Sequence, residues 1–455
     1  MHFDLTKVDT GNTAWVLASA ALVLLMTPGL AFFYGGMVRS KNVLGMLMQN
    51  FVTIGIVGVV WVMVAYSLAF GSNGFGGFAG NLHQFGLGHM SEQVAGYQGG
   101  LAQTIPPIVF MAFQLMFAII TPALITGASA DRLKFGAFVV FVTVWIIAVY
   151  APIAHWVFSP EGWLFQKGAE DFAGGTVVHA NAGAAGLALA IVLGKRLGWK
   201  KDPMRPHNLP FTLLGAGLLW FGWFGFNAGS ALGAGNLAGI AFVNTNTATC
   251  AAMLGWLIVE RFRDGHPTTL GAASGAVAGL VAITPAAGFV SPVGAVLLGL
   301  IAGAVCALAI SLKYRLGYDD ALDVVGVHLV GGVVGALLIG FLGTNRGNGG
   351  IGLNGAFYGG GWHLLRLQAM AVGAAVGYSF VATLIIAKVL DMVIGLRLTR
   401  DEEQEGMDTV LHAETAYDFG GVAAGGFSPH QRAATGGPPV GASAGGQSRV
   451  EGAQA

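Results

Sequence analysis

Apolar runs long enough to cross a lipid bilayer recur along almost the whole chain. A transmembrane helix needs about 20 consecutive, mostly apolar residues. Eleven runs of this kind lie near residues 13–35, 43–70, 107–130, 135–158, 176–194, 209–231, 237–260, 268–285, 289–312, 324–343 and 367–394. Only 10% of the residues are charged, whereas a soluble domain carries roughly 25%, so a water-soluble fold is excluded. The pattern predicts an all-α integral membrane protein with eleven transmembrane helices.

The basic residues of the loops indicate the orientation in the membrane. Short cytoplasmic loops retain Lys and Arg, whereas translocated loops are poor in them. The odd-numbered loops carry most of them, and the even-numbered loops carry only Lys167, Arg346 and Arg366. This alternation predicts a multi-pass protein of the cell membrane (inner or plasma membrane), with the N-terminus outside and the C-terminus in the cytoplasm. The N-terminal segment lacks the basic region and cleavage site of a secretory signal, so we expect the first span to be retained.

The charge balance and the two cysteines exclude several kinds of partner. Acidic and basic residues number 22 each, so nothing indicates a nucleic acid partner. Cys250 and Cys306 lie inside apolar runs and are interpreted as small buried hydrophobic residues, not as a disulfide or a metal site. Membrane lipid is the expected surrounding.

Two histidines, His179 and His328, stand in related sequences within the fifth and tenth spans. Each has Gly four and seven residues later and Asp eight residues earlier, namely Asp171 and Asp320. Two further related sequences, IITPAL and AITPAA, join the third span to the eighth. Because an offset of five spans is odd, the two halves would have opposite orientations, as in transporters built from inverted repeats. We therefore expect an inverted five-helix repeat (helices 1–5 and 6–10) plus an eleventh bracing helix, with the histidines meeting near the bilayer centre.

The two histidines are interpreted as part of a transport pathway, because an ionisable side chain at membrane depth usually marks a pathway or relay. Packing alone could explain one such residue, but two symmetry-related histidines favour a function. A metal site fits less well, since two imidazoles need further ligands and none is placed at the same depth. A neutral imidazole offers one donor and one acceptor, so the pair could pass a small polar molecule or a proton.

Aromatic and hydroxyl side chains on or just after the third, fourth and sixth spans could meet a cation before the histidines do. They are Phe113, Phe117, Phe158, Trp223, Phe226 and Ser230. Aromatic ring faces attract a desolvated cation by about 2 kcal/mol. For any single aromatic residue, packing or a place at the lipid interface is the alternative.

The motifs that contain these residues resemble those of the ammonium transporter, methylammonium permease and Rhesus (Amt/Mep/Rh) family, of the bacterial ammonium transporter type. The motifs are DFAGGTVVHANAG at 171–183, GWFGFNAGSA at 222–231, DVVGVH at 323–328, ITPA at 283–286, AFFYGGMVRSKN at 31–42 and FQLMF at 113–117. The resemblance extends from the first span to about residue 418. It implies a homotrimer with one pore in each subunit, which takes ammonium from outside and conducts it past phenylalanines and twin histidines.

The resemblance also implies roles for individual residues. The recruitment site would contain Phe113, Phe158, Ser230, Trp223 and Asp171, the gate Phe117 and Phe226, and the pore His179, His328 and Thr284. Asp171 would orient the recruitment site or assist deprotonation, and it could also cap the start of the fifth span by accepting backbone N–H groups. Phe158 departs from the family pattern, which often has Trp there, so external ammonium binding would be weaker or Trp156 or Trp163 would substitute.

Ammonium is expected to cross as ammonia, because taking a cation into an apolar pore costs many kcal/mol. The imidazoles would replace some of the lost hydrogen bonds, whereas potassium has no proton to shed. The family resemblance favours a proton that follows along the histidine pair, which would make transport electrogenic.

The chain changes character after the last span, which gives three expected regions. Residues 1–394 would form the transmembrane ammonium channel. Residues 395–419 resemble the family's regulatory C-terminal region, which in bacterial members helps to bind a trimeric PII-type signal protein; a solvated tail is the alternative. Residues 420–455 are rich in Gly, Ala, Ser and Pro and are expected to be disordered.

Two other functions fit part of the sequence. One is an ammonium sensor (transceptor) that relays substrate binding through the tail, and the other is a Rhesus-type gas channel that also passes carbon dioxide. An intramembrane enzyme is disfavoured, because no Ser–Lys pair, paired Asp or HExxH motif lies at membrane depth. We also expect no cofactor.

Overall fold

Membrane-crossing helices build the computed structural model, which describes residues 2–97, 103–346 and 350–417. Ten of the described helices are long and apolar enough to cross a membrane, and α11 is a shorter apolar helix. In chain order they correspond to the eleven predicted spans, so the all-α membrane fold is confirmed. The segment predicted to be disordered, 420–455, lies outside the described residues.

The elements follow one another as two halves, a last membrane helix and two short helices. The first half contains α1 (Thr10–Met37), α2 (Val43–Val60), η3 (Trp61–Ala65), α3 (Tyr66–Phe70), α4 (Pro107–Ser129), α5 (Phe135–Trp145), η7 (Ile146–Tyr150), α6 (Ala151–Phe158), α7 (Trp163–Gln166), η8 (Gly175–Ala180) and α8 (Asn181–Leu193). The second half contains α9 (Leu209–Gly229), α10 (Asn236–Arg263), α11 (Thr269–Ile283), α12 (Pro292–Ala309), α13 (Leu312–Leu316), η9 (Val325–Leu329) and α14 (Val330–Leu342). They are followed by α15 (His363–Ile394), α16 (Arg400–Glu405) and α17 (Met407–His412).

Short elements occupy the loops between these helices. They are the 3₁₀ turns η1 (Leu5–Lys7), η2 (Ser40–Asn42), η4 (Phe75–Gly77), η5 (Phe85–Leu87) and η10 (Ala356–Tyr358), and the antiparallel strands β1 (Asn73–Gly74) and β2 (Ala79–Gly80). The strands pair with Asn73 opposite Gly80. In contrast, η3, η7, η8 and η9 are π-helical turns that continue into membrane helices.

The helices contact one another in the pattern that an inverted repeat requires. In the first half α2 packs against α4 and α5, and in the second half α10 packs against α11 and α12. The two halves meet through α1 and α9, the first helix of each half. They meet again through the fifth helices, because α8 contacts η9 and α14 contacts η8. The predicted relation between helices 1–5 and helices 6–10 is confirmed.

This contact between halves explains the glycine that follows each histidine by four residues. A Cβ atom on Gly183 would lie 2.6 Å from Cα of Leu329, and one on Gly332 would lie 2.7 Å from the carbonyl oxygen of Gly175. Cβ atoms do not tolerate such distances, and small residues let helix backbones approach this closely. The same glycine recurs because each half packs against the π-helical turn of the other half.

The eighth span is shorter than predicted, since α11 ends at Ile283 and its fifteen residues rise only about 22 Å. Residues 284–288, directly after the helix, are buried, so protein shields their backbone from lipid. Proline alone does not decide where this helix ends, because the related Pro122 lies inside α4. Instead, the carbonyl of Pro285 accepts the N–H of Phe172 at 3.1 Å, and the side-chain amide of Asn244 donates to two further carbonyls of the segment, each at 2.8 Å.

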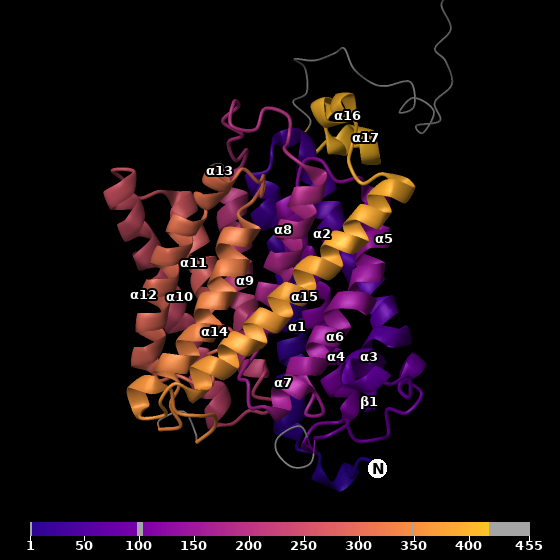
Figure 1. The fold of residues 1–455 in the computed structure, drawn as a ribbon, viewed down its shortest axis with the longest axis vertical. Coiled ribbons are helices and arrows are strands. Elements are labelled where there is room, and N and C mark those ends of the chain that lie inside the picture. Colours follow the sequence, from indigo (N-terminus) through magenta and orange to yellow (C-terminus); the bar gives the residue numbers. More distant parts are fainter. Residues whose placement is uncertain (1, 98–102, 347–349, 418–455) are drawn as a thin grey trace, which may run out of the picture. The chain divides into compact units, whose positions relative to one another are not determined.

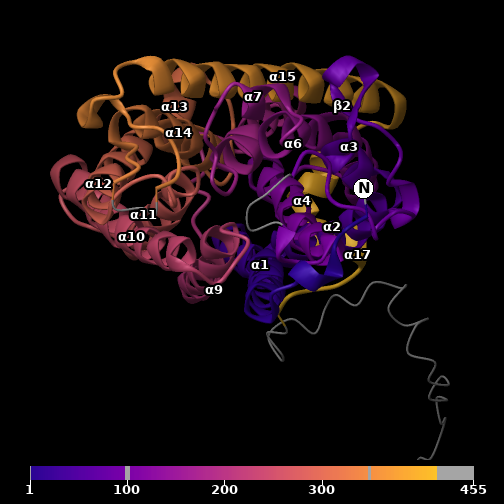
Figure 2. The ribbon, with the colours of Figure 1, turned by 90° about the horizontal axis from the view of Figure 1, so that it is seen from below.

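The last membrane helix, α15, contacts both halves of the bundle. It runs obliquely past α8 and α14 in Figure 1 and lies along one side of the bundle in Figure 2. The side chain of Gln368 binds both halves, because its Nε2 donates to the carbonyls of Glu170 at 2.7 Å and Ala336 at 3.1 Å. Its Oε1 accepts the N–H of Glu170 at 2.8 Å. The predicted bracing role of the eleventh helix is confirmed.

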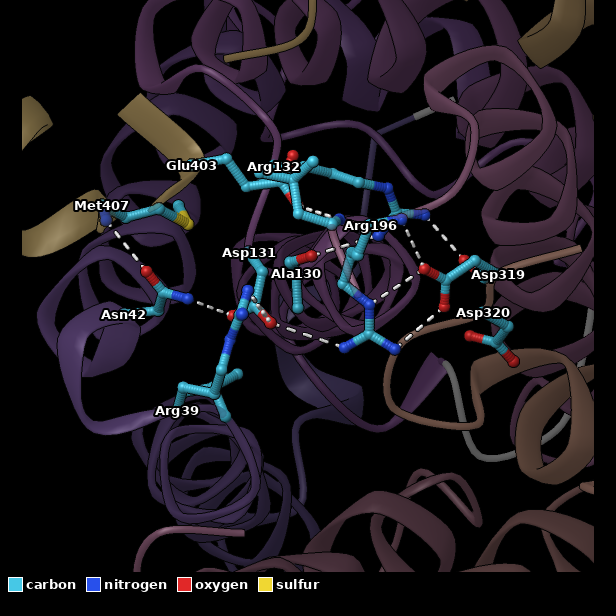
Figure 3. Close-up of polar contacts among 12 residues, drawn as sticks. Arg39, Asn42, Ala130, Asp131, Arg132, Arg196, Asp319, Asp320, Glu403 and Met407 are labelled. Carbon is cyan, nitrogen blue, oxygen red and sulfur yellow. Dashed lines mark hydrogen bonds and ion pairs between the residues drawn. The ribbon is translucent and has the colours of Figure 1, made fainter. Parts of the chain in front are cut away.

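Polar contacts hold α16 and α17 against the loops at one end of the bundle (Figure 3). The buried carboxylate of Glu403 accepts the N–H of Leu197 at 2.7 Å and pairs with Arg397 at 2.7 Å. The side chain of Asn42 accepts the N–H of Met407 at 2.9 Å. Helix α15 ends at Ile394, so these contacts belong to the segment predicted to be regulatory.

A buried ion-pair network lies directly beneath these contacts. Asp131 accepts a hydrogen bond from Asn42 and pairs with Arg39 at 3.1 Å and Arg196 at 3.4 Å. Arg196 also binds Asp319 at 2.8 Å. Burial opposes the ionisation of Asp319, but its bonds to Arg196 hold its pKa below the ordinary value. The network therefore joins the first, third, fifth and ninth loops, and Asn42 links it to α17.

Candidate functional site

Two π-helical turns bring His179 and His328 together in the interior of the bundle. Their Nδ1 atoms lie 3.4 Å apart, and their rings stack with centroids 5.4 Å apart. The exposed fractions are 1% and 2%. The hydroxyl of Tyr34 lies 3.5 Å from Nε2 of His328, whereas Nε2 of His179 has no hydrogen-bond partner among the described residues. The histidines meet as the repeat predicts, and one of their nitrogens remains able to bond a passing molecule.

An aspartate four or five residues before each π-helical turn accepts hydrogen bonds from backbone N–H groups at the start of that turn. Both carboxylate oxygens of Asp171 are used, because four successive backbone N–H groups, those of residues 174 to 177, donate to them at 2.7 to 3.1 Å. Asp320 accepts the N–H groups of Val324 and Val325 at 3.1 and 2.7 Å. Burial raises the pKa of both carboxyls against the effect of these bonds, that of Asp320 to about 6. The capping role weighed for Asp171 is thus present in the structure.

Trp223 and Thr284 hold His179 in place. The indole of Trp223 stacks on the imidazole with centroids 5.2 Å apart and an interplanar angle of 17°. Its Nε1 donates to the hydroxyl of Thr284 at 2.8 Å, and that hydroxyl donates in turn to the carbonyl of Leu280 at 2.7 Å. Trp223 was predicted in the recruitment site and Thr284 in the pore, and in the structure their polar groups bond one another.

A continuous row of aromatic rings leads to the histidines. The rings of Phe117 and Phe226 are tilted by 38° with centroids 4.3 Å apart, and the ring of Phe226 lies 5.9 Å from that of His179. On the far side, Phe158 approaches Phe117 edge-on at 6.5 Å. Phe113 is fully buried and packs against Phe117 at 4.9 Å. The two predicted gate residues therefore separate Phe158 from the histidine pair.

A cavity of about 500 Å³ borders Phe117. Its lining includes Phe165 of α7, which lies at the end of the bundle opposite α16 and α17 (Figure 1). Phe158, Ser230 and Asp171 also line the cavity, whereas Phe113 and Trp223 are absent from its described lining. The hydroxyl of Ser230 donates to the carbonyl of Phe226 at 2.8 Å, so its oxygen lone pairs can accept hydrogen bonds from a molecule in the cavity.

The tryptophans considered as substitutes at the position of Phe158 point elsewhere. Trp156 is 7% exposed, and its Nε1 donates to the carbonyl of Phe78 at 2.7 Å. Trp163 packs beside Trp156 with ring centroids 6.1 Å apart. Neither belongs to the described lining of the cavity, whereas Phe158 and Phe165 from the same part of the chain do.

Glu170 is a lining residue that the sequence prediction missed. Its Oε1 accepts the N–H of Leu353 at 2.5 Å, which ties the loop before α15 to the wall of the cavity. Its Oε2 is buried and has no partner among the described residues. Burial raises the pKa of this carboxyl to about 7. The only sequence signal was a second acidic residue directly before the DFAGG motif.

Replacing this carboxyl with an amide changes how stability depends on pH. The pKa of Glu170 is about 7 in the folded protein against 4.5 ordinarily, so the cost of ionising it is absent below pH 4.5 and complete above pH 7. Glu170→Gln keeps an acceptor for Leu353 without the charge. At pH 8 we expect it to raise the free energy of unfolding by on the order of 3 kcal/mol, and with it the melting temperature. Near pH 4.5 the melting temperature should be unchanged. Thermal unfolding in detergent would measure this, with the exposed Glu405→Gln as control. An equal shift at both pH values would contradict the assignment.

The fold and the site together define a membrane transport protein, whose interior holds a histidine pair next to two packed phenylalanines and a cavity. The chain belongs to the ammonium transporter family. The sequence pattern of the Ammonium Transporter Family matches residues 14–417. An ammonium transporter of Mycobacterium bovis is 55% identical over 444 residues, covering 92% of this chain and 93% of that protein.

Solved structures show the same fold. Mep2 of Saccharomyces cerevisiae is similar with a TM-score of 0.81 and 35% identity, covering 87% of this chain and 89% of that chain. A protein described as "Sensor Amt Protein" is similar with a TM-score of 0.80 and 32% identity, covering 89% of this chain and 98% of that chain. The family and fold are therefore established by both sequence and structure.

Proposed function

We propose that this protein recruits ammonium at the outer cavity, removes a proton, and conducts ammonia past Phe117 and Phe226 and along the histidine pair into the cytoplasm. The observation that carries the proposal is the unbroken sequence of contacts from the cavity through the two phenylalanines to His179, whose Nε2 is free to bond. The similarity to an ammonium transporter of Mycobacterium bovis supports the choice of substrate.

The cavity offers ammonium both aromatic faces and oxygen acceptors. Phe158 and Phe117 present rings, which attract a desolvated cation by about 2 kcal/mol, and Ser230 presents a hydroxyl oxygen. Asp171 does not bond the cation directly in this proposal, because its four amide bonds occupy both oxygens. It positions the turn that carries His179.

The pore selects by charge and by hydrogen bonding. Phe117 is 1% exposed and Phe226 is 0% exposed, so a cation would lose its hydration there at a cost of several kcal/mol. Ammonium avoids this cost by losing a proton, and the imidazoles then form hydrogen bonds with the neutral ammonia. We propose that the proton follows along the histidine pair, which makes transport electrogenic.

The same proposal includes the orientation and the partners. The N-terminus faces outside, and the end with α16 and α17 faces the cytoplasm, because the basic loops gather there. The functional unit is a homotrimer with one pore per subunit. Residues 1–394 are the channel, and residues 395–419 are the region that docks a PII-type signal protein. The anchoring of α16 and α17 to the loops by Glu403 and Asn42 supports this assignment.

A current measurement tests the function. Proteoliposomes that contain the full-length protein are adsorbed to a solid-supported membrane and exposed to a step of ammonium and then to an equal step of potassium. We expect a transient current with ammonium and none with potassium, and none from empty liposomes. A potassium current of comparable size would contradict the proposed deprotonation.

An ammonium sensor is the second candidate, and the similarity to the protein described as "Sensor Amt Protein" favours it. Growth of a cell that lacks its own ammonium transporters, at limiting ammonium, separates the two functions. Rescue of growth supports transport, because a sensor without transport would not supply nitrogen.

A further inference from the structure

A compact group of metal-binding side chains lies in the loop between α3 and α4, away from the transport pathway. The carboxylate of Glu92 contacts two imidazoles, with its Oε2 3.0 Å from Nε2 of His83 and its Oε1 3.3 Å from Nδ1 of His89. The two rings stack with centroids only 4.0 Å apart. Among the described residues, these three form the one group of three or more His, Cys, Asp or Glu side chains whose ligand atoms all lie within 4.8 Å of one another.

The backbone of this loop brings the three side chains together. The N–H of Glu92 donates to the carbonyl of His89 at 3.0 Å, so these residues share one turn. The side chain of Asn81 accepts the N–H of His83 at 3.0 Å, just before the turn η5 reverses the chain. Glu92 also stands opposite His2 in an antiparallel bridge, and side chains directly opposite in such a pair lie on the same face. His2 therefore neighbours Glu92 on the backbone, although it is not one of the three side chains whose ligand atoms gather there.

We propose that His83, His89 and Glu92 bind a divalent transition metal ion of the zinc type. Bonds of about 2.0–2.1 Å to nitrogen and oxygen place tetrahedral ligand atoms roughly 3.3 Å apart. The two contacts of 3.0 and 3.3 Å already match this spacing. His2 or a water molecule supplies the fourth ligand. Two imidazole ligands favour zinc, copper or nickel over calcium and magnesium, which prefer oxygen.

Binding requires at least one of the two stacked imidazoles to turn, because the lone pair of a ring nitrogen lies in the ring plane, but it requires no net change in protonation of neutral rings. Without metal, a ring nitrogen of each histidine faces the carboxylate. When a neutral imidazole changes tautomer, its proton moves to the other ring nitrogen, and the nitrogen that faces the carboxylate gains a free lone pair. The metal ion then takes the place of the proton that made the hydrogen bond. Side-chain exposures of 49% for His83 and 48% for His89 leave the site open to ions from solution.

Isothermal titration of the purified full-length protein with zinc chloride tests this site. The protein carries a tag without histidine, because a polyhistidine tag would bind the ion. We expect saturable binding of about one ion per chain at the site. The double variant His83→Ala/His89→Ala should weaken it by far more than tenfold, since even outer-shell partners of a metal are worth about 10–100-fold in affinity.

The controls separate this site from weak binding elsewhere. His363→Ala removes an exposed histidine outside the cluster and should leave the isotherm unchanged, and Glu92→Gln should weaken binding without removing a histidine. Magnesium chloride should give no saturable heat. Absence of zinc binding by the unmodified protein, or an unchanged isotherm in the double variant, would overturn the proposal. The elution profile in size-exclusion chromatography verifies that each variant is folded.

Discussion

We expect the double variant His179→Ala/His328→Ala to lose the ammonium-evoked current of proteoliposomes. The ring of His179 lies 5.9 Å from that of Phe226 and stacks on His328, and Nε2 of His179 has no hydrogen-bond partner among the described residues. Alanine removes these hydrogen-bonding groups and leaves an apolar cavity. A lost hydrogen bond costs about 1–1.5 kcal/mol, so two lost bonds slow conduction roughly a hundredfold.

His155 provides a matched control for this experiment. It is a buried histidine whose two ring nitrogens are both bonded, at 3.1 Å to the carbonyl of Ala69 and at 2.9 Å to the side chain of Asn73. His155→Gln should retain a selective ammonium current once equal amounts of folded protein are compared. An undiminished, selective current in the double alanine variant would refute the role of the histidine pair.

We expect Asp171→Asn to lower both the melting temperature and the ammonium current. Asparagine has one acceptor oxygen, so two of the four backbone N–H groups that now bind the carboxylate would face an NH₂ group instead. Each unsatisfied buried amide costs about 1–3 kcal/mol, which gives a loss of about 2–6 kcal/mol. The turn that carries His179 would start in the wrong place, and the current should fall at least tenfold because roughly 1.4 kcal/mol in the barrier is enough for that.

The symmetry-related Asp320→Asn is the matched comparison. Its two amide bonds use one oxygen each, so asparagine leaves a single N–H group unsatisfied and the melting temperature should fall about half as far. Thermal unfolding and current measurements on the same preparations check both variants. If Asp171→Asn lost the current at an unchanged melting temperature, Asp171 would act as a proton acceptor and not as a cap.

The membrane spans and their order could be predicted, because length and hydropathy alone decide whether a helix crosses a bilayer. The repeat and the meeting of the histidines followed from spacings that a shared local geometry imposes, namely an aspartate eight residues before and a glycine four residues after each histidine. These spacings involve residues that lie close together in the sequence, so they could be recognised from the sequence alone.

Other features depend on contacts between distant segments and could not be predicted. The short α11 follows from the contacts that Phe172 and Asn244 make to its C-terminal end, since the related Pro122 is accommodated inside a helix. The hydrogen bond from Trp223 to the hydroxyl of Thr284 joins two segments that lie far apart in the sequence. Glu170 was missed because its burial is created by the loop at Leu353.

The single side chain of Gln368, bonded at once to Glu170 in one half and Ala336 in the other, has a consequence for the speed of the transport cycle. Rocking of one repeat against the other, which takes microseconds to milliseconds, would break these bonds. Aromatic rings such as those of Phe117 and Phe226 need only rotate within a fixed frame. The throughput of this pathway should therefore depend on side-chain rotation and proton transfer, with no alternation between inward-open and outward-open states.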